Sequence, residues 1–373
     1  MKENNFYRDT WAEVDLIAIK HNIREISKLY QDQKNIYAVV KANAYGHGDV
    51  EVAKAAIEAG ANRLAVALLD EAIKLRQHYQ DIPILVLGRI RPEDAPIAAK
   101  YKITVTVFQK EWVQEAKKHL NDVLSIHLKI DTGMNRIGIR TFLEAYDVLN
   151  EVCSSKIEIT GIYTHFATAD EEDQSYLQSQ LVQFQKYLQE LKGEFTETVE
   201  VHVGNSAAAM RYPESMYDAV RFGIGMYGLY PSDTVRNESD IVLKPAFSLH
   251  SRLTHVKEIE PGESVSYGAT YTATENEWIG TIPIGYGDGW TRKLQNFSIM
   301  VDGKKFRLVG RICMDQCMVK LNQPYPVDTK VTLIGVNQGE MVTMDEVADY
   351  LDTINYEIPC MINQRVPRVF INH

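Results

Sequence analysis

The sequence is poor in cysteine. Its four cysteines, Cys153, Cys313, Cys317 and Cys360, show neither the spacing of a zinc site nor the density of a disulfide scaffold. Cys313 and Cys317 form a CxxxC pair, but no second Cys/His pair accompanies them. We therefore expect no metal site, and we interpret the thiols as the reduced cysteines of a cytoplasmic protein.

Positive charge and long apolar runs are also scarce. The 40 basic residues are outnumbered by 50 acidic ones, so the net charge is −10, whereas a nucleic-acid binder usually has a basic surface. The first residues lack the apolar stretch of a signal peptide, and no segment approaches transmembrane length. The sequence thus predicts a cytoplasmic protein with neither a nucleic-acid nor a membrane partner.

Short β-branched runs alternate with amphipathic stretches over the first two thirds of the chain. Eight strands with intervening helices in about 220 residues are typical of a (β/α)8 barrel. The expected strands are 36–41, 63–68, 83–87, 103–107, 125–130, 158–163, 200–203 and 219–222, and the expected helices are 16–30, 50–59, 70–80, 110–120 and 174–191. An open doubly wound sheet is the alternative, but residues 41–48 have the wrong glycine spacing for a dinucleotide turn.

The pattern changes at the polar stretch 232–240, which has no apolar period. Strand-like runs, frequent glycine and proline, and one clear helix at 344–351 follow, so the rest of the chain should be mostly β. We expect an α/β fold with a barrel domain at 1–240 and a smaller, mostly-β domain at 241–373. A strand-like segment at 7–14 precedes the barrel, and the first ~12 residues are expected to pair with the second domain.

Reactive groups in barrel enzymes lie at the C-terminal ends of the strands. Lys41 ends the first expected strand, directly after an apolar run. Desolvation there can lower the pKa of a lysine amine, which a Schiff-base lysine requires. A solvated lysine at a strand end is equally compatible with the position alone.

Barrels often hold a phosphate on the loops after strands seven and eight. The seventh strand runs into Gly204-Asn205-Ser206 and the eighth into Gly223-Ile224-Gly225, and small residues let an anion approach the backbone. Simple helix capping by Asn205 or Ser206 is the alternative. Arg221 shares a strand face with Gly223, so it either faces a bound ring or forms a structural ion pair.

Several motifs in one order resemble bacterial alanine racemases, which are fold-type III pyridoxal-phosphate enzymes. The first is Ala38-Val-Val-Lys41-Ala-Asn-Ala-Tyr45-Gly-His-Gly48. The others are Lys129-Ile-Asp131-Thr-Gly-Met-Asn-Arg136, Tyr163-Thr-His165, Asn205-Ser206, Arg221-Phe-Gly-Ile224, Ser266-Tyr267-Gly-Ala-Thr-Tyr, Pro283-Ile-Gly-Tyr286, Gly310-Arg-Ile-Cys-Met314-Asp315 and Thr353-Ile-Asn-Tyr356. The resemblance covers nearly the whole chain.

This resemblance implies a role for each matched residue. Lys41 would carry pyridoxal 5'-phosphate, Arg221 would face the pyridine nitrogen, and His202 would orient Arg221. The phosphate would be held by Tyr45, Asn205, Ser206, Gly223, Ile224 and Tyr356, with Tyr163 and His165 beside the ring. Arg136 and the backbone N–H of Met314 would bind the substrate carboxylate, with Tyr286 at the substrate entrance and Asp315 in a supporting place.

Three further residues bear on catalysis and selectivity. Tyr267 matches the second catalytic base, which in this family enters the site of the partner subunit in a head-to-tail homodimer. Without the resemblance, a buried tyrosine packed in a β-domain would be the default. Lys129 matches a lysine that the family often carbamylates. Gly287 departs from the family's usual alanine, which leaves the substrate entrance less certain than the reaction type.

The resemblance implies an enzyme that interconverts L-alanine and D-alanine by a two-base mechanism, with Lys41 on the D face and Tyr267 on the L face. D-Alanine would supply cell-wall peptidoglycan. A racemase of broader specificity, for serine or lysine, stays open. A fold-type III decarboxylase fits less well because Arg221 replaces the usual acidic partner of the ring nitrogen. A barrel-only cofactor-binding protein does not account for Tyr267 and Met314.

Overall fold

The computed structural model of the chain describes residues 6–31, 33–153, 155–195 and 198–372. The backbone folds into two compact units. One, the barrel unit, contains residues 17–44 and 49–245, and the other, the β unit, contains the described parts of 1–16, 45–48 and 246–373. Within the opening segment that we expected to pair with the second domain, residues 1–5 lie outside the described residues.

Eight parallel strands close into the barrel, and β2 and β9 pair to complete the ring. Most strand residues are fully buried, because a barrel strand faces a packed interior on one side and helices on the other. The strands are β2 (Asn35–Val39), β3 (Arg63–Val66), β4 (Ile84–Val86), β5 (Thr104–Val107), β6 (Leu124–Lys129), β7 (Ile157–Tyr163), β8 (Glu200–Gly204) and β9 (Ala219–Phe222). The predicted (β/α)8 barrel is confirmed.

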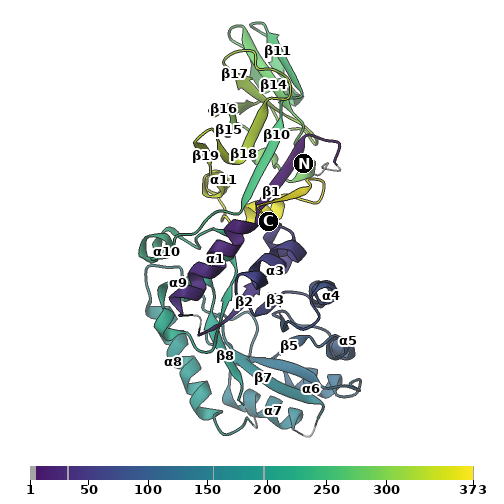
Figure 1. Cartoon of the computed structure of the whole chain (residues 1–373), viewed down its shortest axis with the longest axis vertical. Coiled ribbons are helices and arrows are strands. Elements are labelled where there is room, and N and C mark those ends of the chain that lie inside the picture. The colour runs from purple at the N-terminus through teal and green to yellow at the C-terminus, as the bar shows by residue number, and fades with distance from the viewer. Residues whose placement is uncertain (1–5, 32, 154, 196–197, 373) are drawn as a thin grey trace. The chain divides into compact units, whose positions relative to one another are not determined.

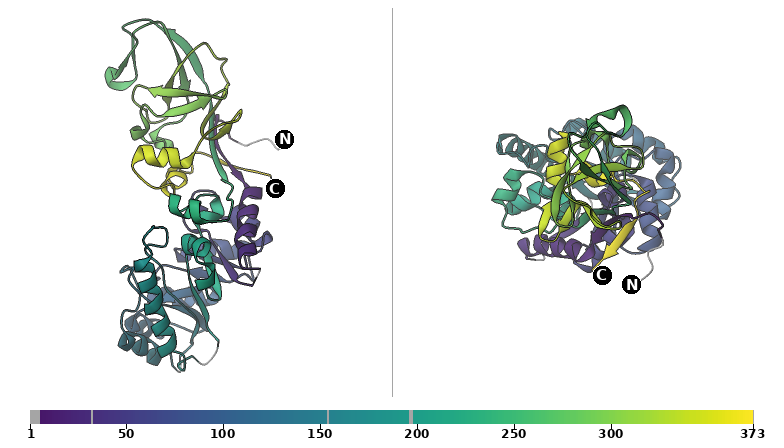
Figure 2. Two further views of the ribbon diagram at one scale, coloured as in Figure 1. Left: turned by 90° about the vertical axis from the view of Figure 1, so that its left-hand side faces the viewer. Right: turned by 90° about the horizontal axis from the view of Figure 1, so that it is seen from above.

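Helices lie around the outside of these strands (Figures 1 and 2). They are α1 (Leu16–Leu29), α3 (Asp49–Glu58), α4 (Leu69–His78), α5 (Ala95–Lys100), α6 (Lys110–Ala116), α7 (Phe142–Val152), α8 (Ser175–Glu190), α9 (Ser206–Arg211) and α10 (Asp233–Glu238), with 3-10 turns η1 (Pro92–Asp94), η2 (Pro213–Ser215) and η3 (Ile224–Tyr227). No helix among the described residues combines the length and apolarity that a bilayer crossing needs.

Some helix predictions need correction. The predicted helices did not include α5 and α7. For α7 a signal was present, because Thr141 and Glu144 have the spacing of a capping pair, and the Thr141 side chain accepts a hydrogen bond from the Glu144 N–H. The stretch 232–240 is not irregular, because Ser232 caps the short helix α10.

A ten-stranded sheet dominates the β unit, and β1 (Thr10–Asp15) lies between β10 and β20. The remaining strands are β10 (Phe247–Arg252), β11 (His255–Ile259), β14 (Glu277–Ile282), β15 (Ser298–Val301), β16 (Lys304–Val309), β17 (Cys317–Leu321), β18 (Lys330–Asn337), β19 (Glu340–Val342) and β20 (Arg368–Ile371), with helices α11 (Met344–Leu351) and α12 (Glu357–Met361) and 3-10 turns η4 (Tyr267–Ala269), η5 (Tyr286–Asp288) and η6 (Arg292–Leu294). The prediction of one clear helix here missed the short α12.

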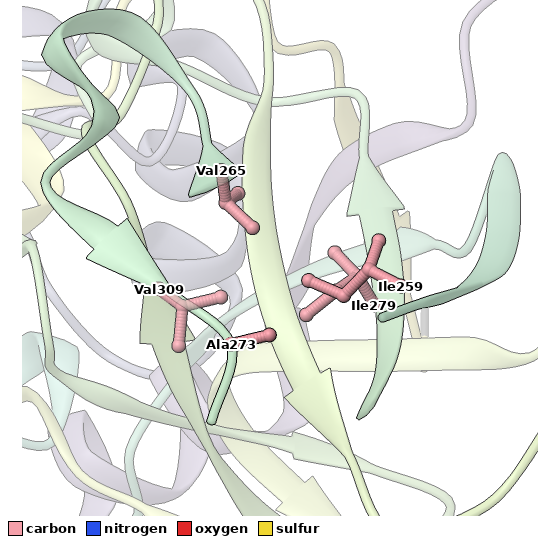
Figure 3. Close-up of a cluster of buried hydrophobic side chains, with 5 residues drawn as sticks. All are labelled: Ile259, Val265, Ala273, Ile279 and Val309. Atoms are coloured by element: carbon pink, nitrogen blue, oxygen red, sulfur yellow. The ribbon is translucent and has the colours of Figure 1, made fainter. Parts of the chain in front are cut away.

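A separate two-stranded hairpin, β12 (Ser264–Val265) and β13 (Tyr271–Thr272), leaves the main sheet. Buried apolar side chains anchor its base, as Figure 3 shows. They are Ile259, Val265, Ala273, Ile279 and Val309. The tip of the hairpin, residues 266–270, is thus carried on a packed base.

Candidate active site

Lys41 begins a left-handed turn, α2 (Lys41–Tyr45), and does not end a strand as the sequence suggested, since β2 stops at Val39. The φ angles of the four residues after Lys41 are between 51° and 54°, although none is glycine. Each such residue costs about 1–3 kcal/mol, a strain that clusters at functional sites. The carboxylate of Glu71 accepts from the Ala42 N–H at 2.6 Å and from the Ala67 N–H at 2.9 Å, which ties the turn to the next loop.

The side chain of Lys41 lines a cavity of about 370 Å³ in the barrel unit. The cavity wall combines residues from the strand ends and the loops that follow them: Lys41, Ala67, Leu87, Gly88, Arg89, Lys129, Arg136, Ile137, Tyr163, His165 and Arg221. Five of these carry cationic or basic amine groups, and no carboxylate is among them. The cavity therefore favours an anionic ligand.

Lys129 lines this cavity and is only 3% exposed. Burial and the charges of Arg221 and Arg136 lower the pKa of its amine well below the ordinary lysine value, and Asp131 offsets part of that effect. Its Nζ lies 4.9 Å from the centroid of the Tyr163 ring. An amine in this setting is readily neutral and hence nucleophilic.

Arg221 on β9 is 3% exposed and is held by acceptors only. Its guanidinium donates to the Thr164 carbonyl at 2.9 Å, to the Val203 carbonyl at 3.0 Å and to Nδ1 of His202 at 2.6 Å. It also approaches Nδ1 of His165 at 3.2 Å. Burial lowers the pKa of Arg221 to about 10, so the guanidinium remains protonated at neutral pH. The groups that accept these hydrogen bonds are neutral carbonyls and imidazoles.

The two histidines beside Arg221 are kept neutral. Burial, followed by the charge of Arg221, lowers the pKa of both His165 and His202 well below the ordinary histidine value. Because a guanidinium can only donate, each ring accepts at Nδ1 and carries its proton on Nε2. The His202 ring also stacks on Tyr163, with centroids 4.6 Å apart.

The loops after β8 and β9 meet through Ser206. Its Oγ accepts from the N–H of Gly223 at 2.9 Å and from that of Gly225 at 3.3 Å. Asn205 caps α9, since its Oδ1 accepts from the Ala208 N–H at 2.9 Å. Capping and the close approach of the two loops therefore occur together, and Ile224 opens the turn η3 directly after Gly223.

The other candidate residues belong to the β unit. The rings of Tyr45 and Tyr356 lie 6.3 Å apart, and burial raises the pKa of Tyr45. Tyr267 is 73% exposed at the hairpin tip, which the Ser266 hydroxyl secures by donating to the Arg311 carbonyl at 2.6 Å. The default expectation of a buried Tyr267 is therefore wrong.

The loops around Tyr286 and Met314 are joined by hydrogen bonds. The Tyr286 N–H donates to the Cys313 carbonyl at 3.0 Å, and the Gly287 N–H donates to the Met314 carbonyl at 2.8 Å. Asp315 accepts from Arg365 at 2.6 Å. A Cβ on Gly287 would lie 2.4 Å from Nη1 of Arg365, so glycine leaves room for this ion pair.

Sequence reasoning missed Glu71, Arg89 and His127. In the sequence, Glu71 is simply an acidic residue in the first turn of a helix, which does not indicate a role in the site. Arg89 follows the end of a barrel strand, and that position could have marked it as a candidate site residue. His127 follows the alternation of an ordinary buried strand. The nearest signal for it was Gly161, a glycine within the strand that pairs with β6.

Comparisons with known proteins agree over the whole chain. Family models described as "Alanine racemase, N-terminal domain" and "Alanine racemase, C-terminal domain" match residues 14–231 and 246–370. The chain is 53% identical to an alanine racemase of Geobacillus stearothermophilus, over 99% of this chain and 95% of that protein. It also resembles a crystal structure of alanine racemase from Bacillus anthracis with bound L-Ala-P, with a TM-score of 0.96, 47% identity and coverage of 99% and 97%. A histidine racemase from Leuconostoc mesenteroides is similar too, with a TM-score of 0.91, 33% identity and coverage of 99% and 100%.

Proposed function

The chain belongs to the alanine racemase family, and we propose that it interconverts L-alanine and D-alanine with pyridoxal 5'-phosphate as its cofactor. The observation that carries the proposal is the cationic cavity that both Lys41 and Arg221 line. Racemisation removes the Cα proton from one face and returns it to the other, so two groups must flank that carbon. Lys41 serves the D face and Tyr267 the L face.

The cavity suits this cofactor chemically. An amine at the wall, a fixed buried guanidinium and a lining without carboxylates match an aldehyde, a ring nitrogen and a phosphate dianion. Bound there, pyridoxal phosphate would supply the electron sink that makes the Cα proton removable. Tyr45, Asn205, Ser206, Gly223, Ile224 and Tyr356 would hold its phosphate, and Tyr163 and His165 would lie beside its ring.

Arg221 favours racemisation over decarboxylation. A guanidinium cannot accept a proton, and this one is already occupied by three acceptors, so it would leave the ring nitrogen unprotonated. The electron sink is then weak, which is sufficient for a brief carbanion and limits side reactions such as transamination. Release of CO2 from a diamino acid would contradict this assignment.

Substrate binding falls to Arg136 and the backbone N–H of Met314, which would receive the carboxylate. Lys129 would be carbamylated, and its lowered amine pKa supports that reaction because only a neutral amine attacks CO2. The carbamate would replace the amine with an anion able to pair with Arg136. Intact-protein mass measured at neutral pH, with and without bicarbonate, tests this against Lys129→Ala.

We further propose a head-to-tail homodimer in which Tyr267 and Met314 complete the partner's site. Both side chains are more than half exposed on the β unit, as groups that serve a second copy would be. Mixing inactive Lys41→Ala with inactive Tyr267→Phe after reversible dissociation tests this. If sites are shared, each mixed dimer contains one intact site, and about a quarter of wild-type activity should return. Mixing that restores nothing, with mixed dimers verified by mass, would exclude shared sites.

The proposed substrate is alanine rather than serine, lysine or histidine. A chiral assay with each amino acid on the purified protein, with the cofactor spectrum recorded alongside, should give the highest kcat/KM for alanine. A larger kcat/KM for another amino acid would redirect the assignment within the family. A role in supplying D-alanine for peptidoglycan, and action in the cytoplasm, follow from this proposal.

A further inference from the structure

The hydrogen bonds that begin at Arg221 continue through the barrel interior beyond His202. Nε2 of His202 lies 2.9 Å from Nδ1 of His127 on β6, and both residues are buried. Because Arg221 occupies Nδ1 of His202, the His202 proton is on Nε2 and is donated to His127. His127 must accept at Nδ1, so it carries its own proton on Nε2. One donor at Arg221 thereby fixes the tautomers of two rings in series.

The backbone makes room for this second ring. Gly161 on β7 pairs with His127, and a Cβ built on Gly161 would lie 2.5 Å from Cε1 and 2.6 Å from Nε2 of the imidazole. Any side chain at position 161 would displace the ring. The glycine in the middle of a strand is therefore explained by the place of His127.

Charges around His127 keep it neutral. Burial, then the charges of Arg63 and Arg221, lower its pKa to about 3. The ionisable groups that face it are Arg63, Glu200, His202, Arg221 and Tyr163. At neutral pH the two imidazoles thus act as fixed dipoles between the guanidinium and the barrel floor.

At its His127 end, this series of hydrogen bonds reaches a second cavity. His127 lines a space of about 390 Å³ at the ends where the barrel strands begin, together with Tyr37, Arg63 and Glu200. Glu200 accepts from Asn35 at 2.6 Å, from Arg63 at 3.2 Å and from the Tyr37 hydroxyl. The floor of the barrel is thus held rigidly beside His127.

A metal site is the competing interpretation of this cluster. Ligand atoms of His127, Glu200 and His202 lie within 4.8 Å of one another. A metal on His202, however, would need a lone pair at Nε2, and that nitrogen carries the proton because Arg221 donates to the other one. The positive charges of Arg63 and Arg221 also oppose a cation here. The geometry points to a hydrogen-bond chain.

We propose that His127 is a positioning residue for catalysis: it accepts the Nε2 proton of His202 and so holds the ring whose Nδ1 keeps the Arg221 guanidinium in place beside the cavity. Gly161 is the second part of this device because it admits the ring. The catalytic consequence rests on the proposed function, but the tautomer chain does not. Its extent means that residues on the barrel floor control the reactivity of a ring bound at the opposite end of the strands.

The tautomers are measured directly by two-bond 1H–15N correlation of the histidine rings, with and without pyridoxal phosphate. We expect His127 and His202 both to be neutral with the proton on Nε2, unchanged between about pH 5.5 and 8. Assignments come from His127→Asn and His202→Gln. A protonated His202, or a proton on its Nδ1, would overturn the proposal whether or not the protein is a racemase.

Variants then test the consequence. In His127→Leu the acceptor is lost, and we expect kcat to fall about tenfold or more with KM within about twofold, together with a changed pH dependence of the cofactor absorbance. His127→Asn, which can place an oxygen near the lost Nδ1, should recover most of kcat, and Gly161→Ala should resemble the leucine variant. His250→Leu, which removes a buried histidine of the β unit, controls for lost stability. A wild-type spectrum and kcat in folded His127→Leu would refute the positioning role.

Discussion

The barrel cavity and the β unit differ in how far their candidate site residues are exposed to solvent. Lys129 and Arg221 are each 3% exposed and are surrounded by hydrogen-bond acceptors and aromatic rings, whereas Tyr267 is 73% exposed and Met314 is 53% exposed. Lys129 and Arg221 are buried, and desolvation lowers the pKa of both side chains. In the homodimer that we propose, the exposed Tyr267 and Met314 would serve a second copy, and one chain would hold two half-sites of different character.

The largest effect is expected from removing the amine of the barrel half. Lys41→Ala deletes both the proposed cofactor attachment and the base for the D face, so turnover should fall at least about 10⁴-fold. Alanine racemisation and the visible cofactor band are measured together. Lys41→Arg is the matched control that keeps the charge without a free amine, and retained racemisation in either variant would refute the role of Lys41.

The second largest effect is expected from removing the exposed phenol of Tyr267. Tyr267→Phe should reduce racemisation by about 10²–10⁴-fold, the usual contribution of a proton-transfer group. Because only the L face loses its base, solvent-deuterium exchange should vanish from L-alanine and partly survive from D-alanine. Tyr271→Phe, on the same hairpin, is the control. Equal loss of exchange from both enantiomers would refute the assignment of faces.

The burial of three histidines in the barrel should be visible in the pH dependence of stability. The pKa values of His127, His165 and His202 are lowered in the folded chain, so the unfolded chain binds protons that the folded one does not as the pH falls below about 6.5. Stability is full above that pH and is lost below it, by at most about 1.4 kcal/mol per pH unit for each histidine.

Urea unfolding at pH 7.5, 6.0 and 5.0 measures this loss. The variant His202→Gln should flatten the decline by about one proton, and the exposed-surface control His255→Gln should not change it. A wild-type free energy of unfolding that is constant from pH 7.5 to 5.0 would show that these rings are not held neutral.

The smallest effect concerns the surface loops of the β unit. In Gly287→Ala, the new methyl group displaces Arg365, whose flexible side chain can move, so stability should change by less than about 1 kcal/mol. KM for alanine should shift by no more than about threefold, with a larger shift for serine. Asp315→Asn, which weakens the partner of Arg365, should give a change of the same sign. A tenfold change in kcat with KM unaltered would contradict a role confined to the entrance.

Strand runs and loop chemistry made the barrel predictable, because β-branched segments such as 103–107 have little alternative to a buried strand. The meeting of Ser206 with Gly223 followed from two small-residue loops at neighbouring strand ends. The left-handed turn after Lys41 could not be predicted from residue types, since Ala-Asn-Ala-Tyr contains no glycine and its strain is maintained by distant partners such as Glu71.

The resemblance implied that His202 orients Arg221, but the continuation of these hydrogen bonds to His127 could not be predicted, for another reason. His127, His202 and Arg221 are spread over three strands, and only the closure of the barrel brings them into line. The residue pattern alone would have packed Tyr267 in a core, as is usual for an aromatic residue in a β-rich segment, and only the resemblance implied a side chain that leaves its own chain. Both depend on which strands become neighbours, which local sequence does not specify.

The place of β1 in its sheet has a consequence for biosynthesis. This strand is made first, yet its neighbours β10 and β20 begin at Phe247 and Arg368. During translation β1 must wait for these partners until residues 247–252 and then 368–371 have left the ribosome, after all the barrel strands have been made.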